Sequence, residues 1–108
     1  MTTAFESSAW IDVSADTGTV ILRICGELDT ATRGVIEPAV LAAIPTAYTV
    51  ILDLADLTFC DSSGLRMFVA AQQTAEVAGT ALKVRNLRPA VARVLAISGI
   101  DQVLDITE

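Results

Sequence analysis

The sequence contains no histidine, and this absence removes two common kinds of functional site. A Ser-His-Asp triad needs histidine as the base for its serine, and a zinc site of the usual kind cannot be assembled within one chain from two cysteines alone. The two cysteines, Cys25 and Cys60, lie in apolar, strand-like segments. We therefore expect them to be small core residues rather than a disulfide framework or a metal site.

Loops that bind nucleotide phosphates or activate a serine are also missing. The only lysine, Lys83, has no glycine-rich Walker loop before it, and the segment 60–64 lacks the first glycine of a nucleophile elbow. Asp53, Asp56 and Asp61 fall within nine residues and offer oxygen ligands for Mg²⁺, but the simpler interpretation is three solvated loop carboxylates. An enzyme, such as a weak nucleotidase using Asp53 and Asp61, is only the third hypothesis. The sequence predicts no catalytic residue, cofactor or metal.

Basic and aromatic residues are scarce. Seven Lys and Arg stand against thirteen Asp and Glu, which gives a net charge of -6, and aromatic residues make up 5% of the chain. An acidic chain repels phosphate backbones and anionic lipids, and few aromatic rings leave little surface for base stacking. No apolar run approaches the roughly 18 residues that cross a bilayer, and the start, Met1–Glu6, lacks signal-peptide features. The sequence therefore predicts a cytoplasmic protein that binds neither nucleic acid nor membranes.

The length of 108 residues and the 53% hydrophobic content fit one domain with a single core. Its first half predicts a hairpin from strands at 9–13 and 19–25, followed by helical spacing from about residue 30 to residue 44. Asp29 or Thr30 is the expected N-cap of that helix. Pro38 lacks an N–H and its ring presses on the carbonyl of Gly34, so we expect either a kink or two short abutting helices.

The second half alternates strands with helices. The run 48–54 is almost continuously apolar, which is typical of an inner strand covered on both faces. Further elements are expected as a helix over 63–78, a strand over 82–85, a helix over 89–98 and a last strand over 103–106. The order is ββαβαβαβ, an α/β domain in which an N-terminal hairpin joins a mixed, partly parallel sheet covered by helices.

The junction between the apolar run and the helix near residue 63 is the most informative segment. Asp61, Ser62, Ser63 and Gly64 stand between Cys60 and the start of the helical pattern. A serine at this point either caps the free N–H groups of the helix or presents its hydroxyl at the positive end of the helix dipole, which suits phosphate. A glycine there leaves room for a partner backbone or a phosphate. From spacing alone, capping is the favoured interpretation.

Three separated motifs, taken in order, carry a family resemblance. They are Gly26-Glu27-Leu28-Asp29, the pair formed by Leu52-Asp53-Leu54 and the segment 59–65, and Asn86-Leu87-Arg88-Pro89 with residues 97–100. With these motifs the chain resembles the STAS family, specifically the bacterial anti-anti-sigma factors, or anti-sigma factor antagonists. The resemblance runs from about residue 8 to residue 107, so that one STAS domain is expected over 1–108.

The resemblance implies a switch between protein partners. In this family the unphosphorylated protein binds an anti-sigma factor, itself a serine kinase of the histidine-kinase-like ATPase type, and so frees the sigma factor. Phosphorylation of the serine directly after the aspartate reverses the binding. Carried over to this sequence, Ser62 is the acceptor, Ser63 is its neighbour, and Asp29 and Asp61 resemble acidic residues that engage the kinase. The ATP belongs to the partner.

The predicted partner surface consists of the two helix starts. Its residues are Asp29, Thr30, Asp61, Ser62, Ser63, Gly64, Leu65 and Arg66. A phosphate role for Arg66 stays open beside that of a solvated helix charge. The alternative function is a non-switching STAS scaffold or ligand-sensing module in a signalling or transport-associated complex, in which Ser62 only caps its helix. The oligomeric state, monomer or weak dimer, is left open.

Overall fold

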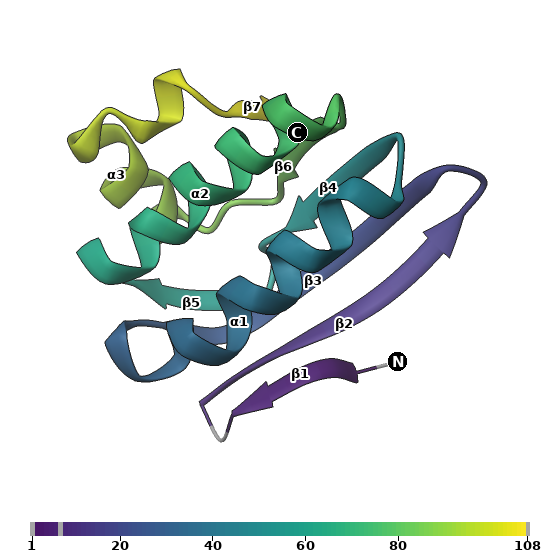
Figure 1. Cartoon of the computed structure of the whole chain (residues 1–108). Helices are drawn as coiled ribbons and strands as arrows, with labels where there is room; N and C mark the ends of the chain where they lie inside the picture. Colours follow the sequence, from purple (N-terminus) through teal and green to yellow (C-terminus); the bar gives the residue numbers. More distant parts are fainter. Residues whose placement is uncertain (1, 7, 108) are drawn as a thin grey trace.

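A mixed β-sheet with helices packed against it makes up the computed structural model, which describes residues 2–6 and 8–107 (Figure 1). Within these residues the sheet has seven strands in the order β1-β2-β3-β4-β6-β7, with β5 pairing with β3 off this path. The strands are β1 (Thr2–Glu6), β2 (Ala9–Asp16), β3 (Thr19–Leu28), β4 (Thr49–Asp53), β5 (Leu57–Cys60), β6 (Ala81–Arg85) and β7 (Asp105–Thr107). The α/β class and the mixed, partly parallel sheet predicted from the sequence are confirmed.

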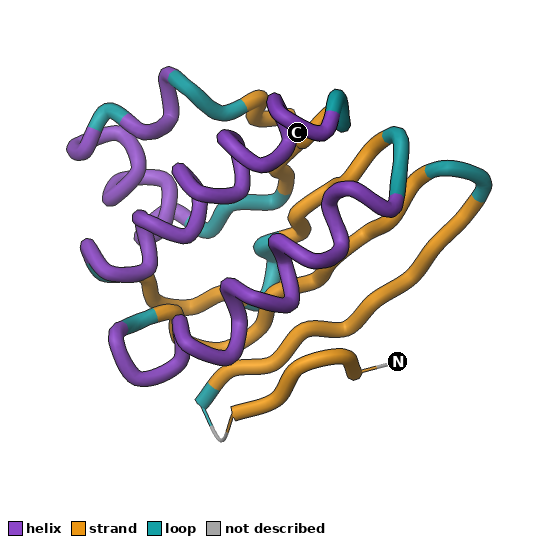
Figure 2. The backbone as a smooth tube through the Cα atoms, in the orientation of Figure 1, coloured by secondary structure: helices purple, strands orange, loops and turns teal. Residues whose placement is uncertain are grey.

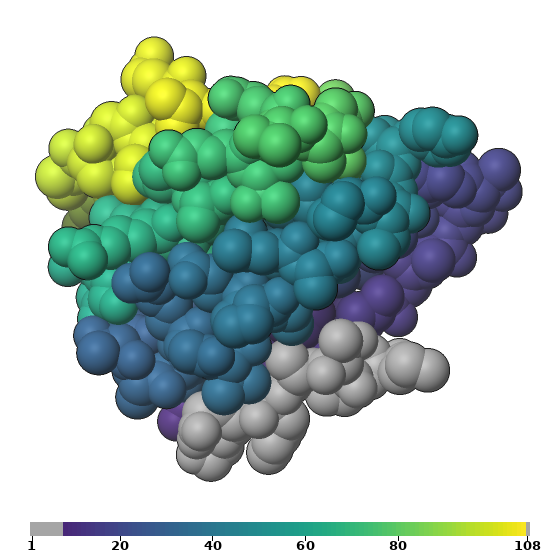
Figure 3. Space-filling model, viewed as in Figure 1, coloured from purple at the N-terminus to yellow at the C-terminus, as the bar shows by residue number. Residues whose placement is uncertain are grey.

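Helices α1 and α2 lie side by side against one face of the sheet (Figure 2), and α3 contacts β5. The helices are α1 (Thr30–Ala43), α2 (Ser62–Ala78) and α3 (Pro89–Ser98), with short 3-10 turns η1 (Ile44–Thr46) and η2 (Ile100–Gln102). In the space-filling view, atoms of α1 and α2 cover much of the face turned to the viewer (Figure 3). None of the helices in the described part of the chain combines the length and the apolar character that crossing a membrane requires.

Two strands, β1 and β5, are absent from the predicted order ββαβαβαβ. Strand β5 forms because β3 is longer than its neighbour β4. The parallel strand β4 pairs with the first half of β3, Thr19 to Arg23, and β5 pairs with the last residues of β3, Gly26 to Leu28. The apolar run therefore does not lead straight to the Asp61–Ser62 junction. It turns at 54–56 and enters the sheet again beside the end of β3.

Strand β4 is covered by helices on one face only, so the prediction of a strand covered on both faces is wrong. Val50 and Leu52 are fully buried on the helix side, whereas Thr49 and Ile51 are only half-buried on the other side. On that open face, charged side chains follow the register of the strands. Asp12 faces Arg23 across β2 and β3, and Arg23 in turn faces Asp53 of β4.

Helix α1 runs unbroken from Thr30 to Ala43 with Pro38 inside it, so the alternative of two abutting helices is wrong. Asp29 is its N-cap, one of the two residues expected there, and Thr30 is the first helical residue. The Asp29 carboxylate accepts hydrogen bonds from the N–H groups of Ala31 and Thr32, each at 3.0 Å. The Thr32 hydroxyl completes a capping box by accepting from the Asp29 N–H at 3.0 Å.

Both cysteines are confirmed as reduced core residues. Cys25 is fully buried, Cys60 is 4% exposed, and both are free thiols. Burial and, to a smaller extent, the neighbouring Asp61 charge together raise the pKa of the Cys60 thiol to about 12. At neutral pH Cys60 is therefore protonated and behaves as an apolar side chain.

Candidate functional site

The parallel pairing of β3 and β5 brings the two acidic helix caps to one edge of the sheet. Leu28 and Cys60 are register partners at the ends of these strands, and Asp29 and Asp61 are the residues that follow them. Each then caps a helix, so the N-terminal ends of α1 and α2 lie at the same edge (Figure 1). Sheet pairing thus joins two motifs that lie far apart in the sequence. We call this region the acceptor edge: Asp29, Thr30, Asp61, Ser62, Ser63 and Arg66.

Asp61, not Ser62, caps helix α2. The Asp61 carboxylate accepts a hydrogen bond from the Gly64 N–H at 3.0 Å, and its own N–H donates to the Leu28 carbonyl at 3.2 Å. Ser62 is the first helical residue and is exposed. Its hydroxyl has no hydrogen-bond partner within the described part of the chain. The favoured interpretation of Ser62 as a cap is therefore wrong, and capping gives no reason for a hydroxyl at this position.

Gly64 is required by packing inside the protein rather than by an approaching partner. A Cβ at this position would lie 2.6 Å from the Leu28 carbonyl oxygen and 2.8 Å from the Cys60 sulfur. The glycine lets α2 lie against the end of β3, and this corrects the expectation that it leaves room for a phosphate. Leu65 is only 7% exposed and belongs to the core. Gly64 and Leu65 therefore present no side chain to a docked protein.

The remaining members of the predicted partner surface are accessible. Thr30, Ser62 and Arg66 are exposed, and Asp29, Asp61 and Ser63 are half-buried. Both carboxylates cap helices, so they lie at the N-terminal ends of α1 and α2. Arg66 stands one turn after Ser62 on the exposed side of α2. The acceptor edge thus offers an exposed hydroxyl next to the Asp61 cap, with one arginine a turn away.

A hollow of about 290 Å³ lies beside Ser63, between α1 and α2. It is lined by Thr30, Arg33, Gly34, Glu37, Pro38 and Ser63. The Arg33 Nε and a Glu37 carboxylate oxygen form an ion pair across one helical turn at 3.3 Å. The sequence analysis missed Arg33 and Glu37, although their spacing of four residues in a predicted helix is a recognisable signal for a surface pair.

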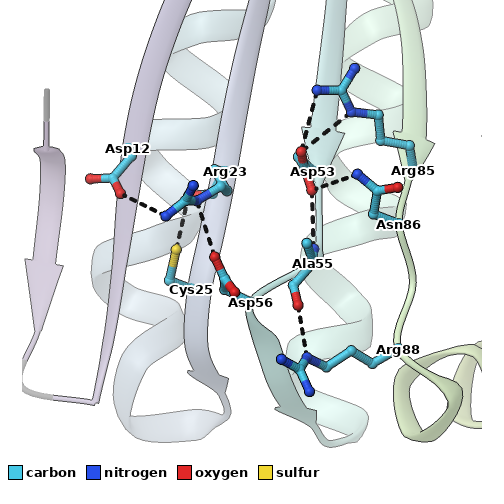
Figure 4. A network of polar contacts seen from close by, with 9 residues as sticks. All are labelled: Asp12, Arg23, Cys25, Asp53, Ala55, Asp56, Arg85, Asn86 and Arg88. Atoms are coloured by element: carbon cyan, nitrogen blue, oxygen red, sulfur yellow. Dashed lines mark hydrogen bonds and ion pairs between the residues drawn. The ribbon is translucent and has the colours of Figure 1, made fainter.

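The open face of the sheet carries a second cluster of charges, shown in Figure 4. Asp53 is 8% exposed and accepts hydrogen bonds from the Arg85 guanidinium at 3.3 Å, from the Asn86 amide at 3.2 Å and from the Ala55 N–H at 3.0 Å. Burial by itself would raise the pKa of Asp53, but these hydrogen bonds and the Arg85 charge outweigh it and lower the pKa below its ordinary value. The expectation of a solvated loop carboxylate is wrong for Asp53.

This cluster also fixes the turn that leads into β5. Arg88 donates from Nε to the Ala55 carbonyl at 2.7 Å, and Arg23 forms an ion pair with Asp56 at 3.2 Å. Within the described residues, no three acidic, cysteine or histidine side chains converge as metal ligands. Asp53 and Asp56 instead form ion pairs with Arg85 and Arg23, so these carboxylates do not form the magnesium site considered from the sequence.

Comparison with known proteins agrees with this architecture. The model of the family described as "Mlab, STAS domain" matches residues 11–106. An anti-sigma F factor antagonist from Paenibacillus polymyxa is 30% identical over 98 residues, which cover 89% of this chain and 84% of the relative. The chain therefore belongs to the STAS-domain family. Among its curated relatives are proteins named anti-sigma factor antagonists.

Solved structures support the same family. An anti-sigma factor antagonist from Mycobacterium paratuberculosis shares the fold with a TM-score of 0.84 at 23% identity, over 96% of this chain and 89% of that one. The Bacillus anti-sigma factor antagonist SpoIIAA is similar in both of its forms. The unphosphorylated form has a TM-score of 0.74 at 26% identity, over 91% of this chain and 88% of that one. The phosphorylated form has a TM-score of 0.68 at 25% identity, over 91% of each chain.

Proposed function

We propose that this protein is an anti-sigma factor antagonist whose binding is controlled by phosphorylation of Ser62. The unphosphorylated form binds an anti-sigma factor that is also a serine kinase and so releases a sigma factor, and modification ends the binding. The single observation that carries the proposal is the Ser62 hydroxyl, exposed at the first residue of α2 while Asp61 performs the capping. The protein itself acts as a binding module and kinase substrate rather than as an enzyme, and its proposed site of action is the cytoplasm.

The proposed switch works through charge and bulk at the acceptor edge. A phosphoserine adds a charge of about -1.5 to -2 and three acceptor oxygens at a position where the partner would otherwise contact a neutral hydroxyl. Unit charges about 4 Å apart interact by about 4 kcal/mol at an effective dielectric near 20, and half of that, after screening, changes affinity more than tenfold. Repulsion and bulk at the interface are therefore sufficient to end binding. Asp29 and Asp61 already make the acceptor edge anionic, and the phosphate adds further negative charge to it.

The phosphate is expected to leave the fold unchanged. Ser62 begins a helix, so a phosphate on its side chain lies at the positive end of the α2 dipole, which stabilises anions. Because Ser62 is exposed, the modification displaces no packed side chain. Backbone amide signals should shift near Ser62 and stay in place on the distant strands β6 and β7. Large shifts on those strands would replace the surface mechanism with a change of fold.

The direct test is phosphorylation by a kinase-type anti-sigma factor. The purified protein is incubated with ATP and a panel of such kinases from the same organism, and the phosphate is located by mass spectrometry. Ser62→Ala should bind the kinase and resist modification, whereas Ser62→Asp should weaken binding at least tenfold. Ser14→Ala, at an exposed serine of β2 outside the acceptor edge, is the control and should be modified like the wild type. Equal binding by the wild type, Ser62→Ala and Ser62→Asp would favour a non-switching scaffold instead.

A further inference from the structure

Two basic side chains of this protein, those of Arg66 and Arg93, have no partner among the described residues. The chain has seven basic residues, and all of them lie in the described part. The other five each form an ion pair or a hydrogen bond through the side chain, namely Arg23, Arg33, Lys83, Arg85 and Arg88. Arg66 and Arg93 form neither within these residues. Only Arg66 belongs to the acceptor edge, which therefore carries an unpaired guanidinium.

The neighbours of Arg66 on α2 explain why its guanidinium is unpaired. Side chains three and four positions apart are neighbours on a helix surface. The residues at these positions around Arg66 are all uncharged: Ser62, Ser63, Val69 and Ala70. Asp61 is the nearest acidic residue in the sequence, but its carboxylate accepts from the Gly64 N–H and forms no ion pair with Arg66. A negative charge on Ser62 would therefore give Arg66 its first anionic neighbour on this helix.

Helix geometry directs the Arg66 side chain towards Ser62. The Cα–Cβ bonds of an α-helix tilt towards the N-terminus, so a long side chain covers the turn that precedes its own Cα. Ser62 is the first residue of α2, Arg66 follows one turn later, and both are exposed. An acid four residues before a base is also the more favourable order for a pair on a helix. A phosphate on Ser62 thus lies within reach of the guanidinium without any change in the backbone.

We propose that Arg66 binds the phosphate carried by Ser62 within the same chain and holds it against the first turn of α2. The planar guanidinium can donate hydrogen bonds to two phosphate oxygens at once. Because the pair forms only in the modified state, phosphorylation adds an anion to the acceptor edge and also withdraws the cation of that edge from a docked partner. The inference rests on the proposed function, because it states what the same site does once it is modified.

The test uses protein in which phosphoserine is incorporated at position 62 during translation, so that no kinase is needed. Phosphorus NMR follows the ionisation of the phosphate with pH, around its ordinary second pKa of about 6. A nearby guanidinium favours the dianion, so Arg66→Gln should raise the midpoint by about 0.3 to 0.7, a roughly twofold to fivefold change in the ionisation constant. Arg66→Lys keeps the charge and should restore part of this difference.

Arg93→Gln is the matched control, because it removes the other unpaired arginine from an exposed position on α3. Its midpoint should lie within about 0.1 of that of the unsubstituted phosphoprotein, since the solvent screens distant charges. If Arg66→Gln moves the midpoint no further than Arg93→Gln does, the inference is overturned, while the switch at Ser62 stands.

The side-chain N–H signals of the arginines provide a second readout. Bonding to the phosphate should shift the Arg66 signals between the unmodified protein and the phosphoprotein, whereas the Arg93 signals should stay in place. Arg66 signals that do not move would overturn the inference. Shifted Arg66 signals in a protein that no kinase modifies would retain the ion pair and remove the switch, so the two proposals fail separately.

Discussion

The open sheet face and the acceptor edge both consist of acidic residues at or after strand ends, yet their polar groups have different partners. Asp53, at the end of β4, is almost buried and is bonded to Arg85, Asn86 and Ala55. At the acceptor edge, the Asp61 carboxylate caps α2 by accepting a hydrogen bond from Gly64. The Ser62 hydroxyl beside it is exposed and has no hydrogen-bond partner within the described residues. The bonds of Asp53 are explained by their contribution to stability. The Ser62 hydroxyl makes no such contribution within the protein, which leaves it available to a partner.

The largest effect should come from breaking the open-face cluster with Asp53→Ala. This change leaves Arg85 and Asn86 without their shared acceptor, and loss of one member of a largely buried pair should cost about 2 to 4 kcal/mol of unfolding free energy. Urea unfolding measures it. Asp56→Ala is the control, because its pair with Arg23 is half-exposed and should contribute less than about 1 kcal/mol. A cost for Asp53→Ala as small as that of Asp56→Ala would contradict a structural role for the cluster.

Gly64→Ala should have the next largest effect. The added methyl group would meet the Leu28 carbonyl, which belongs to the backbone and cannot easily move aside. We expect a loss of about 2 to 3 kcal/mol, typical of overpacking. The same measurement on Gly34→Ala, where the added methyl group would have no atom within 4 Å, is a matched control within the neighbouring helix and should show a gain in stability. If both variants shift in the same direction, the assignment of Gly64 to close packing fails.

Asp61→Ala should have a smaller effect on stability. It removes the cap of α2, which is worth about 1 kcal/mol. If Ser62 had the capping role, Ser62→Ala would cost a similar amount and Asp61→Ala would cost little. Chemical denaturation of both variants therefore decides between the two caps. The structure predicts that Ser62→Ala unfolds within about 0.5 kcal/mol of the wild type, as a surface substitution should.

Sequence patterns predicted the periodic parts of the fold and the strand-to-helix junction at Asp61 and Ser62, and they failed where pairing between distant segments decides the structure. The four residues of β5 have no distinctive pattern, and they form a strand because the end of β3 lacks another partner beyond β4. Asp53 and Arg85 are far apart in sequence and meet only through the parallel register of β4 and β6. Asp61 and Ser62 are both good caps by type, so only the observed start of α2 assigns the role.

The smallest effect, a dependence of stability on pH, should also come from Asp53. The hydrogen bonds and the Arg85 charge that outweigh burial lower the pKa of Asp53 in the folded protein. The charged form of Asp53 therefore contributes its full stabilisation above the pKa of the unfolded chain, about 4. That contribution is lost as the pH falls through the lower, folded pKa. The effect is smaller than that of Asp53→Ala because a protonated carboxyl keeps part of its hydrogen bonds. The stability difference between the wild type and Asp53→Ala, measured by urea unfolding, should therefore be constant between pH 6 and pH 7 and narrow below about pH 4. A difference that stays constant down to pH 2 would show that the ionised form of Asp53 gains nothing from Arg85.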